Sequence, residues 1–164
     1  VAHKLPSPIG IDLDGNGRLD LSSVDRPAGA VAFDLGGWGH AQQIQWLTGS
    51  DGWLCEDLDG DGRIRSGLEL FGTAGGFKSG WAKLALRDRN ADGIISDPEL
   101  DGLSIWVDRN ADGNTDAGEL TPAASAGLSA IAIPESGLQS CVTLRGVTRF
   151  AIDVWPVVFR LRAE

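Results

Sequence analysis

Two acidic segments decide how this chain folds: residues 88–99 read DRNADGIISDPE, and residues 108–119 read DRNADGNTDAGE. In both segments a side-chain oxygen recurs at the first, third and fifth places, a glycine stands sixth and a glutamate stands twelfth. A hard dication such as Ca²⁺ takes about six to eight oxygen ligands, and this spacing lets one loop fold its side chains around a single point. The glycine suits the sharp turn, because it has no Cβ. We therefore interpret both segments as calcium-binding loops.

The predicted ligands occupy the same places in each loop. The seventh residue offers its backbone carbonyl, and the ninth binds directly or through water. The ligands predicted in the first loop are Asp88, Asn90, Asp92, Ile94, Ser96 and Glu99. Those predicted in the second loop are Asp108, Asn110, Asp112, Asn114, Asp116 and Glu119. The eighth residues, Ile95 and Thr115, are expected to pair the two loops through a short strand contact. A single string of this kind is often only a solvated Asp/Gly turn, but two complete copies argue against that interpretation.

Two further loops are less complete. Residues 57–62 read DLDGDG, and the closing acid arrives thirteenth, so this loop must carry one extra residue. Residues 12–17 read DLDGNG, but Ser23 stands at the twelfth place, and Asp20, Asp25 or a neighbouring loop is left to complete the site. The ligands predicted here are Asp57, Asp59, Asp61, Arg63 and Glu69 in one loop and Asp12, Asp14, Asn16 and Arg18 in the other, the arginines through their carbonyls. We expect two Ca²⁺ sites and up to four.

The charge of the chain is concentrated in these loops. The 164 residues form one domain or a tight pair and carry a formal charge of −9. Most of the acids lie in the four loops, so four bound Ca²⁺ would nearly neutralise the chain. The acidity therefore indicates metal sites rather than a partner-binding face. No basic patch favours nucleic acid, and no apolar run approaches the ~20 residues of a membrane helix.

Location is predicted from the metal chemistry. The chain begins at Val1 without a visible signal peptide, so we expect a processed protein or a fragment. Loops of this kind fill passively where Ca²⁺ is millimolar, which indicates an extracellular or periplasmic protein. Cys55 and Cys141 are an even pair; they either form a disulfide or remain buried thiols, since sequence does not give the distance between them.

The remaining pattern predicts an α+β fold, with short antiparallel strands and a few short helices arranged around several EF-hand-like calcium loops. Apolar bursts over 31–55 indicate a small antiparallel sheet. An apolar stripe over 77–85 predicts a helix that enters the Asp88 loop. A short helix over 98–106 is expected to join the two best loops, and Pro122 suits the first turn of another.

Three segments are expected along the chain. Residues 1–8 form a lead-in, because prolines exclude helix there. Residues 9–133 form the calcium-binding multi-loop domain. Residues 134–164 form a β-hairpin extension packed on the same domain, with Arg145-Gly146 at its turn.

From Pro8 to Ile133, about three quarters of the chain, the sequence resembles the calcium-dependent self-processing module of RTX-type secreted bacterial proteins, an EF-hand-like multi-loop domain. The segments that carry the resemblance are residues 8–17, Phe33-Asp34, Asp51-Gly52, Glu69-Leu-Phe-Gly72, the Asp88 and Asp108 loops and residues 105–108 between them. The resemblance implies that Ca²⁺ folds the module, which then cleaves an Asp-Pro bond ahead of the first loop; the released aspartyl end can join a lysine.

The chain departs from that family at the cleavage position, where it has Ser7-Pro8. Cleavage needs an aspartate carboxylate that attacks its own carbonyl at high effective concentration, and serine lacks that carboxylate. Asp97-Pro98 lies inside a loop and is a common loop ending. The resemblance thus implies calcium-driven folding without the cleavage.

We therefore predict a non-catalytic calcium-binding module, not an enzyme, whose fold and docking surface form when the loops fill. Its use would be structural, as an accessory subunit bound to another protein in a secreted or periplasmic assembly. The alternative is a calcium-activated, autoproteolytic module with a degenerate cleavage site. A hydrolase is disfavoured, because His3 and His40 have no evident serine or cysteine partner. Sugar binding is a third option, since calcium and tryptophan together can hold a glycan.

Overall fold

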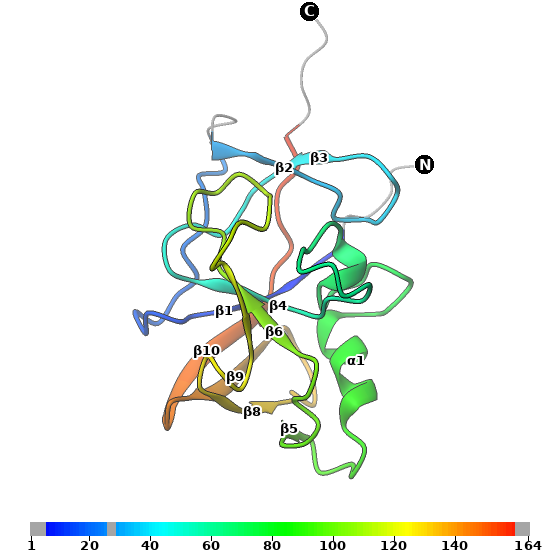
Figure 1. Ribbon diagram of the computed structural model, residues 1–164, viewed down its shortest axis with the longest axis vertical. Helices are drawn as coiled ribbons and strands as arrows, with labels where there is room; N and C mark the ends of the chain where they lie inside the picture. Colours follow the sequence, from blue (N-terminus) through cyan, green and yellow to red (C-terminus); the bar gives the residue numbers. More distant parts are fainter. Residues whose placement is uncertain (1–5, 26–28, 160–164) are drawn as a thin grey trace, which may run out of the picture.

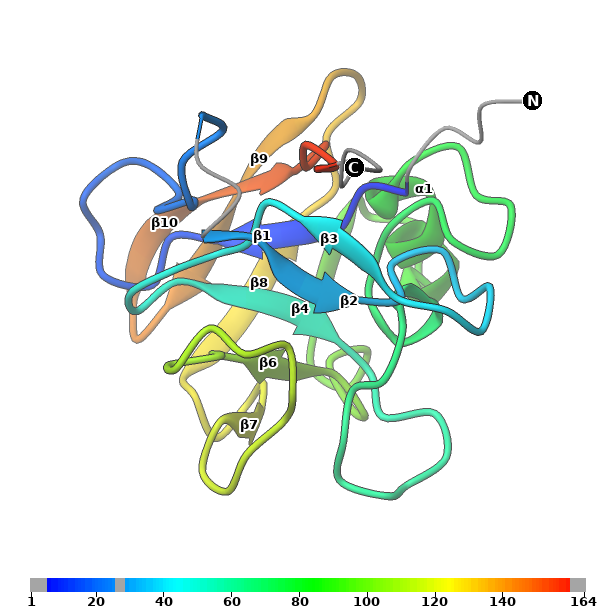
Figure 2. The ribbon, with the colours of Figure 1, turned by 90° about the horizontal axis from the view of Figure 1, so that it is seen from above.

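A curled antiparallel sheet dominates the computed structural model, which describes residues 6–25 and 29–159 (Figure 1). Eight strands follow the order β5-β8-β9-β10-β1-β4-β6-β7, and every neighbouring pair is antiparallel. β2 and β3 form a separate antiparallel pair, which lies at the top of the molecule in Figure 1 and overlies β1 and β4 when the molecule is seen from above (Figure 2). The strands are β1 Ile9–Ile11, β2 Val31–Phe33, β3 Gln42–Ile44, β4 Gly52–Cys55, β5 Ile94–Ser96, β6 Ser104–Trp106, β7 Leu120–Pro122, β8 Leu128–Ala132, β9 Gln139–Leu144 and β10 Val147–Asp153.

The predicted α+β class is therefore wrong. Among the described residues the only α-helix is α1, Gly80–Leu84. The Asp12, Asp57 and Asp108 loops follow strands, and the Asp88 loop follows a 3-10 turn and contains β5, so the loops connect the elements of a sheet instead of organising the fold. The expected helix over 98–106 is a turn followed by β6, which pairs with β4 and β7. Gly102 adopts a φ of 84°, in the left-handed region that ends a helix. Pro122 closes β7 and starts no helix.

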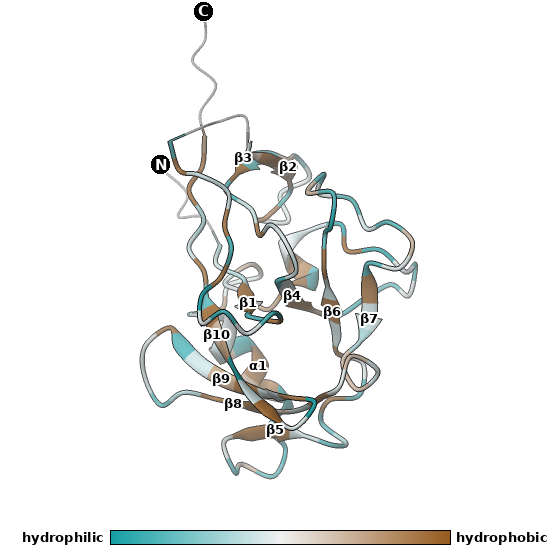
Figure 3. Ribbon diagram, turned by 90° about the vertical axis from the view of Figure 1, so that its left-hand side faces the viewer, coloured by the Kyte–Doolittle hydropathy of each residue, from teal (hydrophilic) through white to brown (hydrophobic). Residues whose placement is uncertain are grey.

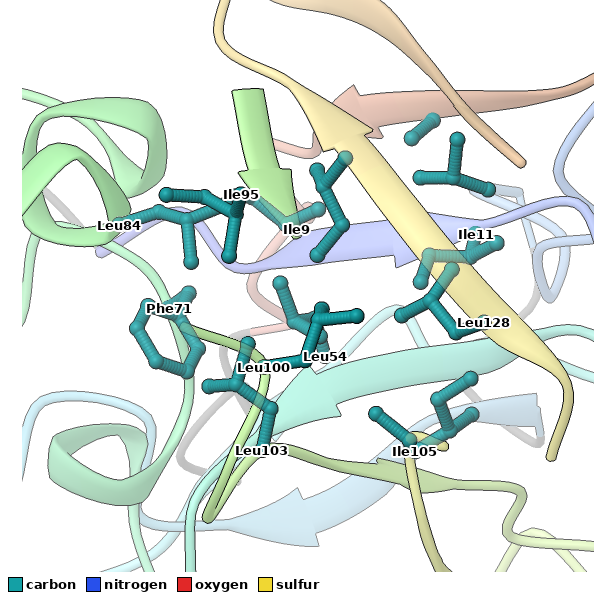
Figure 4. Packing of buried hydrophobic residues seen from close by; sticks show 14 of the residues in the cluster. Ile9, Ile11, Leu54, Phe71, Leu84, Ile95, Leu100, Leu103, Ile105 and Leu128 are labelled. Atoms are coloured by element: carbon teal, nitrogen blue, oxygen red, sulfur yellow. The ribbon is translucent and has the colours of Figure 1, made fainter. Parts of the chain in front are cut away.

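Two apolar cores lie on the two faces of the sheet. Successive side chains of a strand point to opposite faces, so Leu54 of β4 enters one core while Trp53 and Cys55 enter the other. The first core fills the space between the sheet and α1, with Ile9, Ile11, Leu84, Ile95 and Leu128 among its members (Figure 4). The second core joins the sheet to β2 and β3. Because β4 contributes to both cores, all four of its residues are buried, and its three side chains beyond Gly52 are apolar.

The helix predicted before the Asp88 loop is present but short. Ser79 caps it, with its Oγ accepting a hydrogen bond from Ala82 N at 3.0 Å. Trp81 and Leu84 are buried against the first core. A 3-10 turn, Ala85–Arg87, then leads directly into the loop. Two members of the predicted stripe thus lie on the buried face, whereas Ala85 is exposed and Phe77 precedes the helix.

The C-terminal hairpin is also present, with β9 and β10 joined at Arg145-Gly146. Its strands lie in the middle of the large sheet, because β10 pairs with β1 and β9 pairs with β8. β10 and β1 therefore separate β9 from β4. Cys55 on β4 is buried, Cys141 on β9 is exposed, and both thiols are free, so the disulfide alternative is not realised.

Candidate metal centre

In the Asp88 loop, the first and the last acid both accept hydrogen bonds from backbone amides of the same loop. Asp88 Oδ2 accepts a hydrogen bond from the amide of the sixth residue, Gly93, at 2.9 Å. Glu99 Oε1 accepts from the second residue, Arg89, at 2.7 Å, and its Oε2 from the ninth, Ser96, at 3.4 Å. Glu99 therefore clasps the start and the exit of the loop. One carboxylate oxygen each from Asp88, Asp92 and Glu99 lies within 4.8 Å of the others, so these predicted ligands do converge.

The Asp57 loop repeats this arrangement despite its extra residue. Gly62 N donates to Asp57 Oδ2 at 2.8 Å. Glu69 Oε1 accepts from the second residue, Leu58, at 3.2 Å, and its Oε2 from the ninth, Arg65, at 2.7 Å. A 3-10 turn, Gly67–Glu69, takes up the extra residue and aims the acid inward. Oxygens of Asp57, Asp59 and Asp61 lie within 4.8 Å of one another.

The segment that follows this loop fastens it to the rest of the fold. Leu70 enters the second core and Phe71 enters the first. A Cβ on Gly72 would lie 1.6 Å from the carbonyl oxygen of Ser7, so only glycine permits this approach. The Glu-Leu-Phe-Gly run thus joins a candidate ligand to both cores and to the N-terminal strand.

The Asp108 loop shares the clasp but not the convergence. Glu119 accepts amides from the second and ninth residues, each at 2.9 Å. Asn110 Nδ2 donates to the carboxylates of Asp112 and Asp116, at 3.2 and 2.8 Å, so its amide nitrogen rather than its oxygen faces these acids. A half-turn of that amide group would present its oxygen instead. Of the described residues, three acidic groups have converging oxygens, and this loop supplies none of them.

The core holds the first acid of this loop, a contact the sequence did not predict. Trp46 Nε1 donates to Asp108 Oδ2 at 2.8 Å in a buried environment, across 62 residues of chain. Gly113 N donates to the same oxygen at 2.8 Å. Trp46 packs against Phe33, Trp53 and Trp106. No local pattern could have indicated this partner, because the indole and the carboxylate meet only when the second core forms.

The Asp12 loop contains a second unpredicted acid. Gly17 N donates to Asp12 Oδ2 at 2.8 Å, as in the other loops. Oxygens of Asp12, Asp14 and Asp51 lie within 4.8 Å of one another. Asp20 instead pairs with Arg18 at 3.3 Å and accepts from Asn16 Nδ2 at 2.9 Å. Asp25, the other candidate for closure, is exposed and belongs to none of the converging groups.

The loops pair differently from the prediction. Ile95 pairs with Ile131 of β8, so it does not meet Thr115. Thr115 instead accepts from Ile64 N at 2.9 Å, and Ile64 is the eighth residue of the Asp57 loop. The Asp57 and Asp108 loops are therefore the pair that contact through their eighth residues. Strand β8 supplies a longer apolar partner for Ile95 than a single threonine does.

Burial shapes the electrostatics of these sites. It raises the pKa of Glu69 and of Asp108 above their ordinary values, because their charged forms lose solvent. In the Asp57 loop, Arg65 Nε donates to Asp61 Oδ2 at 2.7 Å and lowers the pKa of that exposed acid. This guanidinium stands at the ninth place, so it would have to move for Asp61 to serve a cation.

The donor set fits a hard dication. The converging atoms are carboxylate oxygens, and the acid-rich loops are hydrophilic segments that project from apolar strands (Figure 3). Calcium prefers such oxygen donors. The predicted seventh-place residues are all exposed on the loops: Arg18, Arg63, Ile94 and Asn114. Ser96 and Asp116 contribute amides to the clasps.

Two other candidate features have structural roles. Asp34 accepts the amides of Trp38 and Gly39 at 2.9 Å, so the loop of residues 34–39 keeps the calcium-loop turn without the acids of its third and fifth places. His40 is exposed next to Trp38, with ring centroids 6.0 Å apart. His3 lies outside the described residues.

Fold and site define an antiparallel β-sheet domain that carries repeated acidic Asp/Gly loops at the ends of its strands. The chain belongs to the SPM domain family, whose pattern matches residues 9–147. It is 40% identical over 121 residues to the iron-regulated protein FrpA of Neisseria meningitidis serogroup C. That match covers 69% of this chain and 11% of FrpA, so the chain spans about a tenth of the length of this relative. Within residues 6–25 and 29–159, no helix has the length and apolar character needed to cross a membrane.

Proposed function

We propose that this chain is a non-catalytic module that binds several Ca²⁺ ions, and that these ions set its fold and its docking surface. The observation that carries the proposal is the clasp made by the closing glutamates. In three loops the closing glutamate accepts the amides of the second and ninth residues, while the sixth-place glycine donates to the first acid. In the Asp57 and Asp88 loops the clasp accompanies acid oxygens that lie within 4.8 Å of one another, which a dication would neutralise.

Metal binding should be linked to folding. Acids that converge within 4.8 Å repel one another without a cation, and the burial of Glu69 and Asp108 adds a desolvation cost. A ligand that binds only the folded state stabilises it by about 2.7 kcal/mol per site at a hundredfold excess over Kd. In a domain of this size that corresponds to roughly 5–10 °C in the melting midpoint for each filled site.

The wider role we propose is structural. The module would act as an accessory part of a secreted or periplasmic assembly and dock on another protein, since its loops suit an environment with millimolar Ca²⁺. It would resemble the calcium-dependent self-processing module of RTX-type proteins in its folding but not in its chemistry. Ser7 stands where that chemistry needs an aspartate.

Thermal melting with chelator and with millimolar Ca²⁺ tests the proposal, together with calorimetric measurement of the ions bound per chain. We expect a higher midpoint with Ca²⁺ and at least two bound ions. Asp25→Asn, an exposed change outside the converging groups, should behave as the wild type. A midpoint that does not move with Ca²⁺ would remove the proposed function.

The self-processing alternative has less support. Ser7 N donates to Thr73 Oγ1 at 3.2 Å and Ser7 O accepts from Thr73 N at 3.1 Å, so this peptide is held in place by its backbone. Mass spectrometry of a longer precursor incubated with Ca²⁺ should show no cut at Ser7-Pro8. A cut there would favour the alternative over the non-catalytic role.

A further inference from the structure

The Asp12 loop lacks a closing acid in its own sequence, and Asp51 occupies the equivalent position in space. Asp51 Oδ1 accepts the amide of Leu13 at 3.0 Å, and its Oδ2 accepts the amide of Asp20 at 2.8 Å. Leu13 and Asp20 are the second and ninth residues of this loop. Asp51 therefore makes the same two contacts that Glu69, Glu99 and Glu119 make in theirs.

The fold brings Asp51 to this position from a distant part of the chain. Gly52 pairs with Ile11 at the end of β1, directly ahead of the loop. On the exit side, Thr48 N donates to Asp20 O at 2.7 Å, and Leu47 forms a bridge with Leu21. Residues 47–52 thus run alongside both ends of the loop. An aspartate, one methylene shorter than glutamate, suffices because the backbone itself approaches.

Burial supplies an independent reason for a cation here. Asp12 is 1% exposed and Asp51 is 2% exposed, and an oxygen of each lies within 4.8 Å of the other. Among the described residues, the ion pair found in this loop joins Arg18 to Asp20; the Arg149 guanidinium lies against Gly15, but no ion pair joins it to Asp12 or Asp51. Two buried carboxylates this close repel one another when both are charged, and a cation between them would relieve that repulsion.

We propose that Asp51 closes a divalent-cation site in the Asp12 loop from a separate segment of the chain. This inference rests on the proposed calcium-binding function and adds a ligand to it. Because Asp51 follows Asp20, the ninth residue of the loop, by 31 residues, this site can form only when β1 and β4 are paired. The Asp88 and Asp108 loops carry all of their ligands locally and have no such requirement.

Calcium titration of the full chain by calorimetry, with Asp51→Asn and the exposed control Asp25→Asn, tests this inference. Asp51→Asn should lose one bound ion, or weaken that site by more than the roughly 10–100-fold that loss of an outer-shell partner costs. Asp25→Asn should match the wild type. Unchanged stoichiometry and affinity in Asp51→Asn would overturn the closure by Asp51 while leaving the proposed function intact; a wild type that binds no Ca²⁺ would remove both.

A second measurement needs no variant. In an NMR titration of the wild type with Ca²⁺, the backbone amides of Leu13, Asp20 and Gly52 should shift along one saturation curve. Shifts in the loop that leave Gly52 unaffected would contradict the inference. This result remains informative if Asp51→Asn fails to fold.

Discussion

Trp46 and Trp53 provide a matched test of how the Asp108 loop is anchored, because the two indoles are alike in burial and differ in hydrogen bonding. Their exposed fractions are 0% and 1%, and their rings lie 5.2 Å apart in one core. Trp46 Nε1 donates to Asp108 Oδ2 at 2.8 Å, whereas Trp53 Nε1 has no hydrogen-bond partner among the described residues. Trp46→Phe and Trp53→Phe remove the same ring atoms and leave similar cavities.

The difference between the two variants isolates the hydrogen bond. Loss of ring volume lowers the free energy of unfolding by about 1–2 kcal/mol in each. Trp46→Phe also removes a hydrogen bond to a carboxylate, which contributes about 1.5–3 kcal/mol. Gly113 N still donates to that oxygen, which favours the lower part of this range. Trp53→Phe removes an unpaired buried donor and so gains stability in part. We expect Trp46→Phe to be the less stable variant by about 2 kcal/mol.

Urea denaturation followed by circular dichroism in excess Ca²⁺ measures this difference. Trp46→Phe should also weaken Ca²⁺ binding at the Asp108 loop, since its first acid loses the group that orients it, and Trp53→Phe should not. Two unfolding free energies that agree within about 0.5 kcal/mol, the usual scatter of additive effects, would refute the anchoring.

Gly113→Ala should destabilise the protein more than Gly93→Ala, although both glycines stand sixth in their loops with φ of 77° and 78°. Both variants lose about 1–2 kcal/mol of stability, because alanine is strained in the left-handed region. A Cβ on Gly113 would also lie 2.7 Å from Ala32 O, which costs about 1–3 kcal/mol more. Thermal melting would show which variant is the less stable. Glu99→Gln should weaken Ca²⁺ binding in calorimetry, whereas Asp97→Asn, an exposed change in the same loop, should not. Burial raises the pKa of Asp153, so the folded state binds this proton more tightly than the unfolded state does. The free energy of unfolding of the wild type should therefore fall as pH rises from about 4 through that raised pKa. Asp153→Asn should remove this loss, and denaturation curves of both proteins at several pH values would reveal it as a gap that widens with pH.

The parts of this structure that the sequence predicted are those with local causes. Ligand spacing places the acids of the Asp88 loop within twelve residues, and the turn at Arg145-Gly146 marks a hairpin. The helix before the loop is likewise encoded by one apolar stripe and a serine cap. Strand order has no such local cause: β1 lies between β4 and β10, and its pairing with β10 depends on residues at the far end of the chain.

The errors have the same origin. Ile105 and Trp106 are apolar side chains that fit a helix or a short strand equally well. Their place between β4 and β7 decides for the strand, because Ile105 then enters one core and Trp106 the other. Asp51 was missed as a candidate ligand because its loop lies more than thirty residues away in the chain and no spacing rule connects them.

The sheet rather than a pair of helices therefore positions the acidic loops. β4 lies between β1 and β6 and is antiparallel to both, so the end of β1, the start of β4 and the end of β6 lie at the same edge of the sheet. That edge carries Asp12, Asp51 and Asp108, from three segments far apart in sequence. The Asp88 loop carries its candidate ligands within one segment, whereas a site that needs Asp51 would have no complete ligand shell until the register of β1 and β4 is set. Cation binding at the Asp12 loop would thus stabilise the strand pairing itself, because the ion is shared by the two segments that the pairing brings together.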